Sequence, residues 1–168
     1  AYARSKGVQV NNTPAASSQS VAELVMGHLF TLSRFLHDSN RRMPVEGGEQ
    51  FKALKKAYGK GRELRGMTLA VVGFGRIGQS LAQYAIGCGM KVIGVDQTTG
   101  KQVLAVDIAG QQISVDVPLV TLDEALAAAD AMSLHIPAQA DGQAVIDAEA
   151  IAKMKPGALL LNAARGGV

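Results

Sequence analysis

From Thr68 onward, short apolar runs alternate with segments whose apolar residues recur at helical spacing. The runs are apolar throughout, as expected for strands covered on both faces, and they span 69–72, 91–95, 131–135 and 158–161. Helices are predicted between them, at 76–87, 122–129 and 147–154. Thr121 and Glu124 form a capping box for the second of these helices, and Asp147 caps the third. This alternation predicts an α/β, Rossmann-type fold with a doubly wound parallel sheet.

Residues 102–118 do not follow this alternation. Apolar residues occupy every second position in two short stretches, which flank the sequence Ala-Gly-Gln-Gln at 109–112. A period of two is typical of strands, and the polar, glycine-containing segment between them is typical of a turn. We therefore expect a β-hairpin near 102–118, inserted after the second strand of the sheet.

The N-terminal part carries a longer helical pattern. Ser20 and Glu23 have the spacing of a capping box, and apolar residues follow at helical intervals to about Asn40. A helix over 20–40 is predicted, with an apolar stripe wide enough to pack against a partner. The stretch 43–66 is polar and contains glycines, so it is expected to be a connector with a short helical piece near 51–57.

Composition narrows the class of protein. The 168 residues match one domain, and 19 glycines suit a fold with many tight turns. The single cysteine, Cys88, excludes an internal disulfide and favours a reducing compartment, so we expect a cytoplasmic protein. Six cations between positions 52 and 65 supply much of the excess positive charge, and we interpret them as a solvated connector rather than a nucleic-acid site. No apolar run reaches the roughly 20 residues that cross a bilayer, and we expect neither membrane association nor a metal site.

The most informative local motif follows the first predicted strand. The segment Gly73-Phe74-Gly75-Arg76-Ile77-Gly78 has the form GxGxxG and opens an amphipathic helix. In a dinucleotide-binding loop, Gly73 allows the tight turn, Gly75 lets the pyrophosphate approach, and Gly78 lets the helix pack closely. Asp96 ends the next strand 18 residues after Gly78, where a carboxylate accepts hydrogen bonds from the adenosine ribose. The following residues, 97–99, include no arginine for a 2′-phosphate, so NAD is favoured over NADP.

Five segments carry a more specific resemblance, and they occur in the same order over nearly the whole chain. They are Ser20-Val21-Ala22-Glu23, residues 66–78, Ser133-Leu134-His135-Ile136-Pro137, Lys153-Met154-Lys155-Pro156-Gly157 and Asn162-Ala163-Ala164-Arg165-Gly166-Gly167-Val168. In these segments the chain resembles the D-isomer-specific 2-hydroxyacid dehydrogenases. Within that family it is most similar to the bacterial D-3-phosphoglycerate dehydrogenases.

The resemblance implies a cofactor site and one catalytic residue. Arg165 would hold the substrate carboxylate and help to polarise its carbonyl, a task that suits a planar guanidinium. His135 would contribute contacts rather than proton transfer, and with Ile136 and Pro137 it would line the adenosine side of the cleft. The implied cofactor contacts are Gly73, Gly75, Arg76, Ile77, Gly78, Asp96, His135, Ile136, Pro137, Ala163, Ala164 and Arg165.

The resemblance also implies parts that follow the last residue, Val168. In the family a histidine in a Pro-His motif carries the proton and pairs with a glutamate, and both come after the arginine segment. We therefore expect residues 1–19 to enter from a substrate lobe, and residues 20–168 to be an NAD-binding domain truncated at its C-terminus. Such a domain is expected to bind cofactor without turnover, and to form a homodimer through the 20–40 helix.

The expected reaction is hydride transfer between NAD and a D-2-hydroxy acid. 3-Phosphoglycerate, and with it serine biosynthesis, is the first choice of substrate because of overall likeness alone. Hydroxypyruvate, glyoxylate and D-lactate remain open, since the residues that distinguish these acids would lie in the substrate lobe. A different class of function, an NAD(H)-sensing interaction module, also remains open because the family fold serves transcriptional corepressors.

Overall fold

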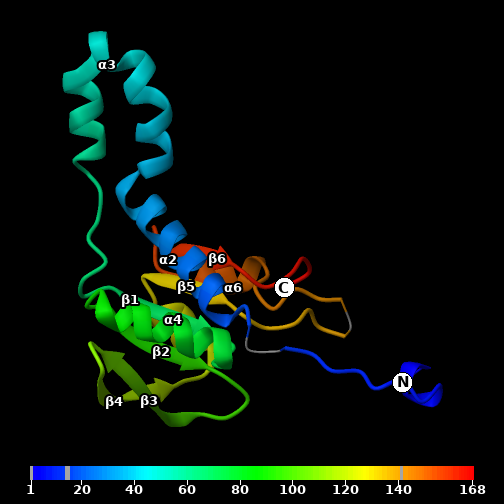
Figure 1. The fold of residues 1–168 in the computed structure, drawn as a ribbon. Coiled ribbons are helices and arrows are strands. Elements are labelled where there is room, and N and C mark those ends of the chain that lie inside the picture. The colour runs from blue at the N-terminus through cyan, green and yellow to red at the C-terminus, as the bar shows by residue number, and fades with distance from the viewer. Residues whose placement is uncertain (1, 14–15, 141) are drawn as a thin grey trace.

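A six-stranded sheet with helices on both faces forms the body of the chain in the computed structural model, which describes residues 2–13, 16–140 and 142–168 (Figure 1). Residues 1, 14 and 15 of the expected 1–19 segment lie outside the described residues. The strand order is β3-β4-β2-β1-β5-β6. The strands are β1 (Thr68–Val72), β2 (Lys91–Val95), β3 (Gly100–Ile108), β4 (Gln111–Leu119), β5 (Ala131–Leu134) and β6 (Leu159–Asn162).

The central strands are parallel, and the helices between them cover the two faces in turn. The helices are α1 (Tyr2–Ser5), α2 (Ser18–Arg34), α3 (Leu36–Tyr58), α4 (Arg76–Gly87), α5 (Leu122–Ala128) and α6 (Ala148–Lys153). β2, β1, β5 and β6 pair in parallel, with α2 and α4 in the core of one face and α5 and α6 in the core of the other. The predicted Rossmann-type α/β fold is confirmed.

The apolar runs form strands because both of their faces are buried. In β1, Leu69 and Val71 pack into the core that contains α4, whereas Ala70 and Val72 pack into the core that contains α5. Every residue of β5 is buried. The capping box of Thr121 is present, and the Asp147 carboxylate accepts a hydrogen bond from the Ala150 amide, so both predicted helix starts are confirmed.

The predicted hairpin is also confirmed, as β3 and β4. Its two turn residues, Ala109 and Gly110, have φ angles of 53° and 81°, which is the left-handed pair that a two-residue hairpin loop requires. The end of β4 lies parallel to β2 through the pairing of Gly94 with Leu119. The hairpin therefore completes the sheet on the side of β2, directly after the predicted ribose-binding Asp96.

The predicted 20–40 helix and the connector after it are wrong in their bounds. α2 begins at Ser18, and the Ser20 hydroxyl donates to the Ser17 carbonyl, so the capping box predicted there is absent. α2 ends at Arg34 because Phe35 adopts a left-handed φ of 55°. Helical structure then resumes as α3 over 36–58, whereas the stretch from 43 to 66 was expected to be a connector with a helical piece only near 51–57.

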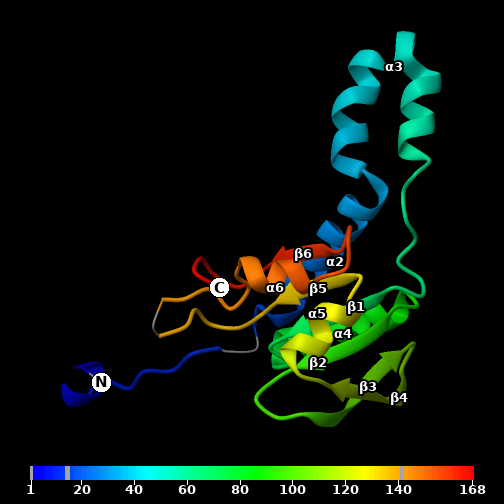
Figure 2. The same ribbon diagram turned by 180° about the vertical axis from the view of Figure 1, so that it is seen from behind.

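α3 bends back on itself at Gln50 and stands away from the sheet as two antiparallel helical pieces, which we call the arm (residues 36–58; Figures 1 and 2). The arm is held by contacts of its own. The Tyr58 hydroxyl donates to Asp38 at 2.8 Å, and Arg42 donates two hydrogen bonds of 2.9 Å to Glu46. This polar sequence is helical because its charged side chains form pairs with each other one helical turn apart.

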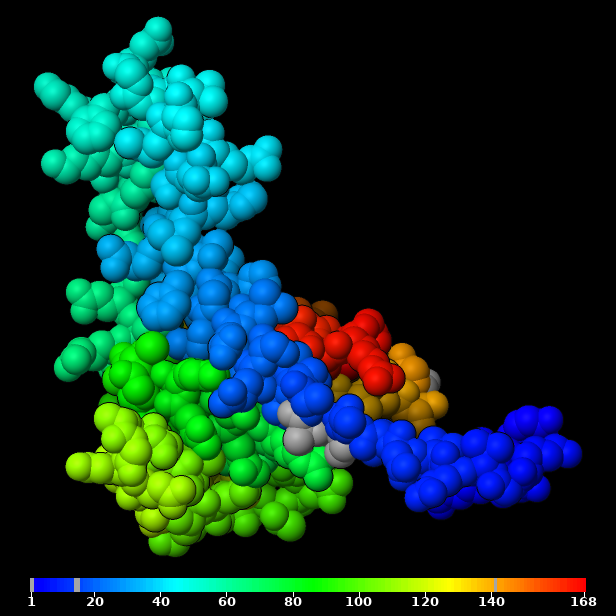
Figure 3. Space-filling model, viewed as in Figure 1, coloured from blue at the N-terminus to red at the C-terminus, as the bar shows by residue number. Residues whose placement is uncertain are grey.

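The N-terminal segment also projects from the body, on the side opposite the arm's base (Figure 3). Residues 2–13 are exposed apart from Ala3, which is half-buried. Among the described residues, no helix combines the length and apolar character needed to span a membrane.

Candidate functional site

Four parallel strands bring the predicted site residues to one edge of the sheet. β2, β1, β5 and β6 lie side by side in that order, and their carboxyl ends face the same way. Asp96, the glycine loop, His135 and the segment 163–165 follow these four ends. Open α/β sheets bind their ligands outside this edge. An extended ligand along it would meet Asp96 at one end and Arg165 at the other.

The glycine loop is closely packed at two of its three glycines. Gly73 has a φ of 90°, and a Cβ there would lie 2.7 Å from the His135 carbonyl oxygen. A Cβ on Gly78 would overlap the Gly73 carbonyl oxygen and lie 2.8 Å from Val71 Cγ1. The loop therefore depends on glycine at these two positions for its own structure.

Gly75 differs, because a Cβ placed on it meets nothing within 4 Å. The residue is the N-cap of α4 and has extended backbone that any amino acid adopts, with no side chain capping the helix. The first-turn amides of α4 thus have neither intrahelical partners nor a cap, and the space in front of them is open. This arrangement fits a phosphate group, which helix N-termini bind through free amides and the helix dipole.

A pocket of about 210 Å³ lies over this loop. It is lined by Gly73, Gly75, Arg76, Ile77, Gly78, His135 and Ser18. Six of these seven residues are predicted cofactor contacts, which the fold brings together from the ends of β1 and β5. Ser18, the first residue of α2, is not among the predicted residues, and only the packing of α2 against α4 shows that it belongs here.

Asp96 holds its carboxylate against the glycine loop. Its Oδ2 accepts a hydrogen bond from the Phe74 amide at 3.1 Å, and its Oδ1 accepts one from the Gln97 amide at 2.8 Å. An ionised carboxylate has about four acceptor positions, so two amides leave capacity for hydroxyl donors. The site thus has a fixed negative charge at the end of β2.

His135 is directed into the protein. Its Nε2 lies 2.9 Å from the hydroxyl oxygen of the fully buried Ser133, and its Nδ1 has no partner among the described residues. Burial lowers the pKa of the His135 imidazole to about 4, so the ring is neutral near pH 7. Such a ring is a poor proton carrier at neutral pH, which supports the expectation that His135 contributes contacts only. Ile136 and Pro137 follow it, and the Ile136 side chain packs beside Gly73.

The segment 163–165 is held by the side chain of Asn162. Asn162 Oδ1 accepts a hydrogen bond from the Ala164 amide at 2.9 Å, and Asn162 Nδ2 donates to the Arg165 carbonyl at 3.0 Å. Val168 is buried at the end of the loop. The Arg165 guanidinium is exposed and has no ion pair within the described part of the chain. Asn162 is therefore a positioning residue that the sequence analysis did not single out.

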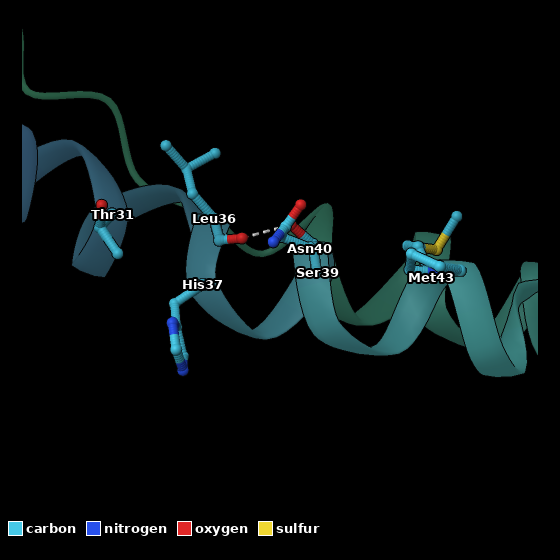
Figure 4. Close-up of a pocket in the computed structure, with 7 residues that line it drawn as sticks. Thr31, Leu36, His37, Ser39, Asn40 and Met43 are labelled. Atoms are coloured by element: carbon cyan, nitrogen blue, oxygen red, sulfur yellow. Dashed lines mark hydrogen bonds between the residues drawn. The ribbon is translucent and has the colours of Figure 1, made fainter.

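A larger pocket lies elsewhere, at the elbow between α2 and the arm (Figure 4). It has a volume of about 710 Å³, and all of its lining residues come from positions 31–44 of one bent helical segment. Figure 4 shows a single hydrogen bond among them, from the Ser39 hydroxyl to the Leu36 carbonyl at 3.1 Å. None of the predicted site residues lines this hollow, so its size does not make it the cofactor site.

Comparison with known proteins decides the family. The model of the D-isomer-specific 2-hydroxyacid dehydrogenase NAD-binding domain matches residues 26–168. The chain belongs to this family. It is 40% identical to hydroxypyruvate reductase of Thermotoga maritima over 98% of its length, and 38% identical to D-3-phosphoglycerate dehydrogenase 2 of Saccharomyces cerevisiae over 99%. A D-lactate dehydrogenase of Aquifex aeolicus, solved with NAD and lactic acid, superposes with a TM-score of 0.69 at 32% identity, over 99% of this chain and 46% of that one.

The matched residues include the glycine loop and every residue that lines its pocket except Ser18. The chain spans 48% of the Thermotoga reductase and 32% of the yeast dehydrogenase. These relatives are named for different acids, so the comparisons establish an NAD-binding domain of the D-isomer-specific 2-hydroxyacid dehydrogenase family and leave the substrate open. The roles of the individual contacts remain predictions.

Substitutions in the glycine loop can distinguish the space that a cofactor would occupy from the space that the packing of the loop itself requires. We expect Gly75→Ala to leave the melting temperature of the chain nearly unchanged, because its Cβ meets nothing, but to weaken NADH binding at least about tenfold by filling the ligand's space. Gly78→Ala should lower both the melting temperature and the affinity, because its Cβ overlaps backbone. Thermal unfolding and NADH titration measure both effects. Full NADH affinity in Gly75→Ala would show that no ligand approaches there.

Proposed function

We propose that this chain is the cofactor domain of an oxidoreductase that moves hydride between NAD and a D-2-hydroxy acid. The observation that carries the proposal is the arrangement along the sheet edge. A carboxylate at the end of β2, uncapped amides at the start of α4 and an unpaired guanidinium after β6 lie in line. Bound NAD supplies the hydride acceptor or donor, and the residues of the chain bind and orient the two reactants.

The charges at the ends of β1 and β2 determine where the pyrophosphate and the adenosine ribose of the cofactor bind. The free amides of α4 bind the pyrophosphate, with Arg76 beside them in the same pocket. The Asp96 carboxylate, already held by two amides, accepts from the adenosine ribose hydroxyls. A 2′-phosphate would place a second negative charge against this carboxylate, and so NAD is favoured over NADP. Ala163 and Ala164 follow β6 at the same edge of the sheet, and they are the proposed cofactor contacts on that side.

Arg165 binds the substrate at the other end. A planar guanidinium donates two parallel hydrogen bonds to a carboxylate, and its fixed positive charge stabilises the oxygen that becomes negative as the carbonyl is reduced. Asn162 holds the backbone that carries this side chain, because it bonds to the Ala164 amide and to the Arg165 carbonyl. Rigid support of this kind is needed because a catalytic group must be held within a fraction of an ångström.

3-Phosphoglycerate is the proposed substrate, and serine biosynthesis the proposed pathway, because D-3-phosphoglycerate dehydrogenases recur among the relatives. Hydroxypyruvate and D-lactate are the alternatives that other relatives support. The single unpaired cysteine supports a reducing, cytoplasmic location.

Kinetics of the enzyme that carries this domain test the proposal. Arg165→Ala should lower kcat/KM for the 2-hydroxy acid roughly 100-fold or more while leaving the affinity for NADH nearly unchanged, because its partner is the substrate. Arg165→Lys should recover only part of the loss, since an ammonium does not reproduce the bidentate geometry. Near-normal turnover in Arg165→Ala would show that another residue holds the acid. Failure of the unmutated enzyme on every D-2-hydroxy acid would refute the function itself.

We also propose a homodimer formed through α2 and the arm. One face of α2 is buried against the sheet body, but Leu24 and Leu32 on its other side are exposed. In the arm, Leu36, Val45 and Phe51 are 48%, 83% and 52% exposed. Apolar side chains gathered on a projecting element favour a protein partner, and a second copy of the same arm offers a matching surface.

Sedimentation equilibrium tests this interface. The unmutated chain should be a dimer at micromolar concentration, and the double variant Val45→Asp, Phe51→Asp should be a monomer with an unchanged melting temperature, because both side chains are exposed in one copy. Lys52→Asp, a charge change next to Phe51, is the control and should remain dimeric. A monomeric unmutated chain, or a double variant that still dimerises, would contradict the proposal.

A further inference from the structure

β3 is an edge strand of the sheet. In the described part of the chain it pairs with β4 alone, through all nine of its residues and without a bulge. Edge strands that avoid pairing with other chains are commonly short, or are broken by a proline or a bulge. β3 contains no proline and is longer than the five or six residues of a common strand. The strand at the other edge, β6, has four residues. The hairpin therefore presents the longer of the two edges to a partner.

Alternate residues of β3 direct their backbone amides and carbonyls to this edge. In a two-residue hairpin loop, the residues that flank the turn, here Ile108 and Gln111, bond to each other. The alternation of an antiparallel ladder then leaves four residues of β3 turned outward: Lys101, Val103, Ala105 and Asp107. The Ala105 carbonyl accepts a hydrogen bond from the Gln83 side chain of α4 at 3.0 Å, which agrees with its outward direction. A carbonyl oxygen has two lone pairs, so capacity remains for a partner amide.

The outward residues form a pattern that is complementary to itself. Lys101 and Asp107 lie three positions before and after Leu104, with Val103 and Ala105 between them. When two copies of β3 pair in antiparallel about Leu104, each Lys101 lies opposite the Asp107 of the second copy. Opposite charges at facing positions stabilise an antiparallel pair. A shift of two residues in either direction separates both charge pairs, so the charges select this one register.

Both charged side chains have capacity for a second partner. The Lys101 ammonium donates to Asp116 of its own hairpin at 2.5 Å, and two further N–H donors remain. Asp107 Oδ1 accepts a hydrogen bond from the Gly110 amide at 3.0 Å, which leaves Oδ2 for an ammonium. Between these two residues, the Val103 side chain is 59% exposed, and a second strand would remove part of it from water.

The hairpin lies at the end of the body opposite the arm (Figures 1 and 2). Contacts between arms and contacts between hairpins therefore use separate surfaces of the chain. A pairing of hairpins can form whether or not the arms are paired.

We propose that β3 pairs with β3 of a second copy, in antiparallel and centred on Leu104, so that two sheets join into one. The Val103 amide of each copy donates to the Ala105 carbonyl of the other, and the two pairs of Lys101 with Asp107 fix the register. One pair of strands buries less than the roughly 1,000 Å² of a stable interface, so the contact is weak and forms near about 100 µM. This pairing does not depend on the proposed reaction, and it adds to the homodimer proposed through the arm.

Sedimentation equilibrium of the arm variant Val45→Asp, Phe51→Asp tests the pairing with the arm contact removed. This variant should be a monomer at micromolar concentration and about half dimeric at about 100 µM. Adding either Lys101→Asp or Asp107→Lys places like charges opposite each other and should weaken the association about tenfold. Lys91→Asp, an equal change of charge at the exposed start of β2, is the control and should leave the association unchanged.

A mixture of the two charge variants tests the register itself. A chain with Lys101→Asp regains both ion pairs opposite a chain with Asp107→Lys, so the equimolar mixture should associate about as tightly as the arm variant. Melting temperatures show whether both chains are folded, and Lys101→Glu with Asp107→Arg makes the same exchange should either variant not fold.

Three results would each overturn the proposal. They are an arm variant that is still a monomer at about 500 µM, charge variants that associate as tightly as the arm variant does, and a mixture that associates no more tightly than its separate components. The second result would show that another surface of the chain holds the copies together.

Discussion

The close approach of α4 and the end of β5 to the glycine loop is the contact on which the site depends. It exists because Gly78 and Gly73 have no Cβ, and the backbone of one element occupies the space that a side chain of the other would fill. That approach points the amides of α4 at the sheet edge, places His135 over the loop, and brings the Asp96 carboxylate within hydrogen-bond distance of the Phe74 amide.

A short polar side chain near the end of each of three strands then fixes the neighbouring loop. Asp96 binds the glycine loop, Ser133 contacts the His135 ring, and Asn162 binds both sides of the turn that carries Arg165. Each contact orders a loop before any ligand arrives, which lowers the entropy lost on binding. Among the described residues, the first-turn amides of α4 have no capping side chain and the Arg165 guanidinium has no ion pair, so both stay available at this edge of the sheet.

The parts of the fold that could be predicted have local signals. Strands buried on both faces are continuous apolar runs, the hairpin at 100–119 alternates with a period of two, and the glycine motif is defined by its spacing. The arm could not be predicted, because its helices are joined by a contact between Asp38 and Tyr58, which are distant in sequence. The position of Ser18 at the pocket could not be predicted for the same reason, since only tertiary packing brings α2 beside the glycine loop. The substrate could not be predicted, because the chain matches relatives named for different acids over nearly its whole length.

The discrimination between NADH and NADPH by the 168-residue chain tests the central claim most directly, because it measures the charge at the end of β2 without requiring turnover. Calorimetric titration of the two cofactors should show NADH binding more tightly by at least about tenfold, and Asp96→Ala should narrow that difference by removing both the ribose acceptor and the repulsion of a 2′-phosphate. Asp107→Ala, which changes an exposed carboxylate near the tip of the hairpin, should leave it unchanged. Equal affinity for NADH and NADPH in the unmutated chain, or tighter binding of NADPH, would contradict the account.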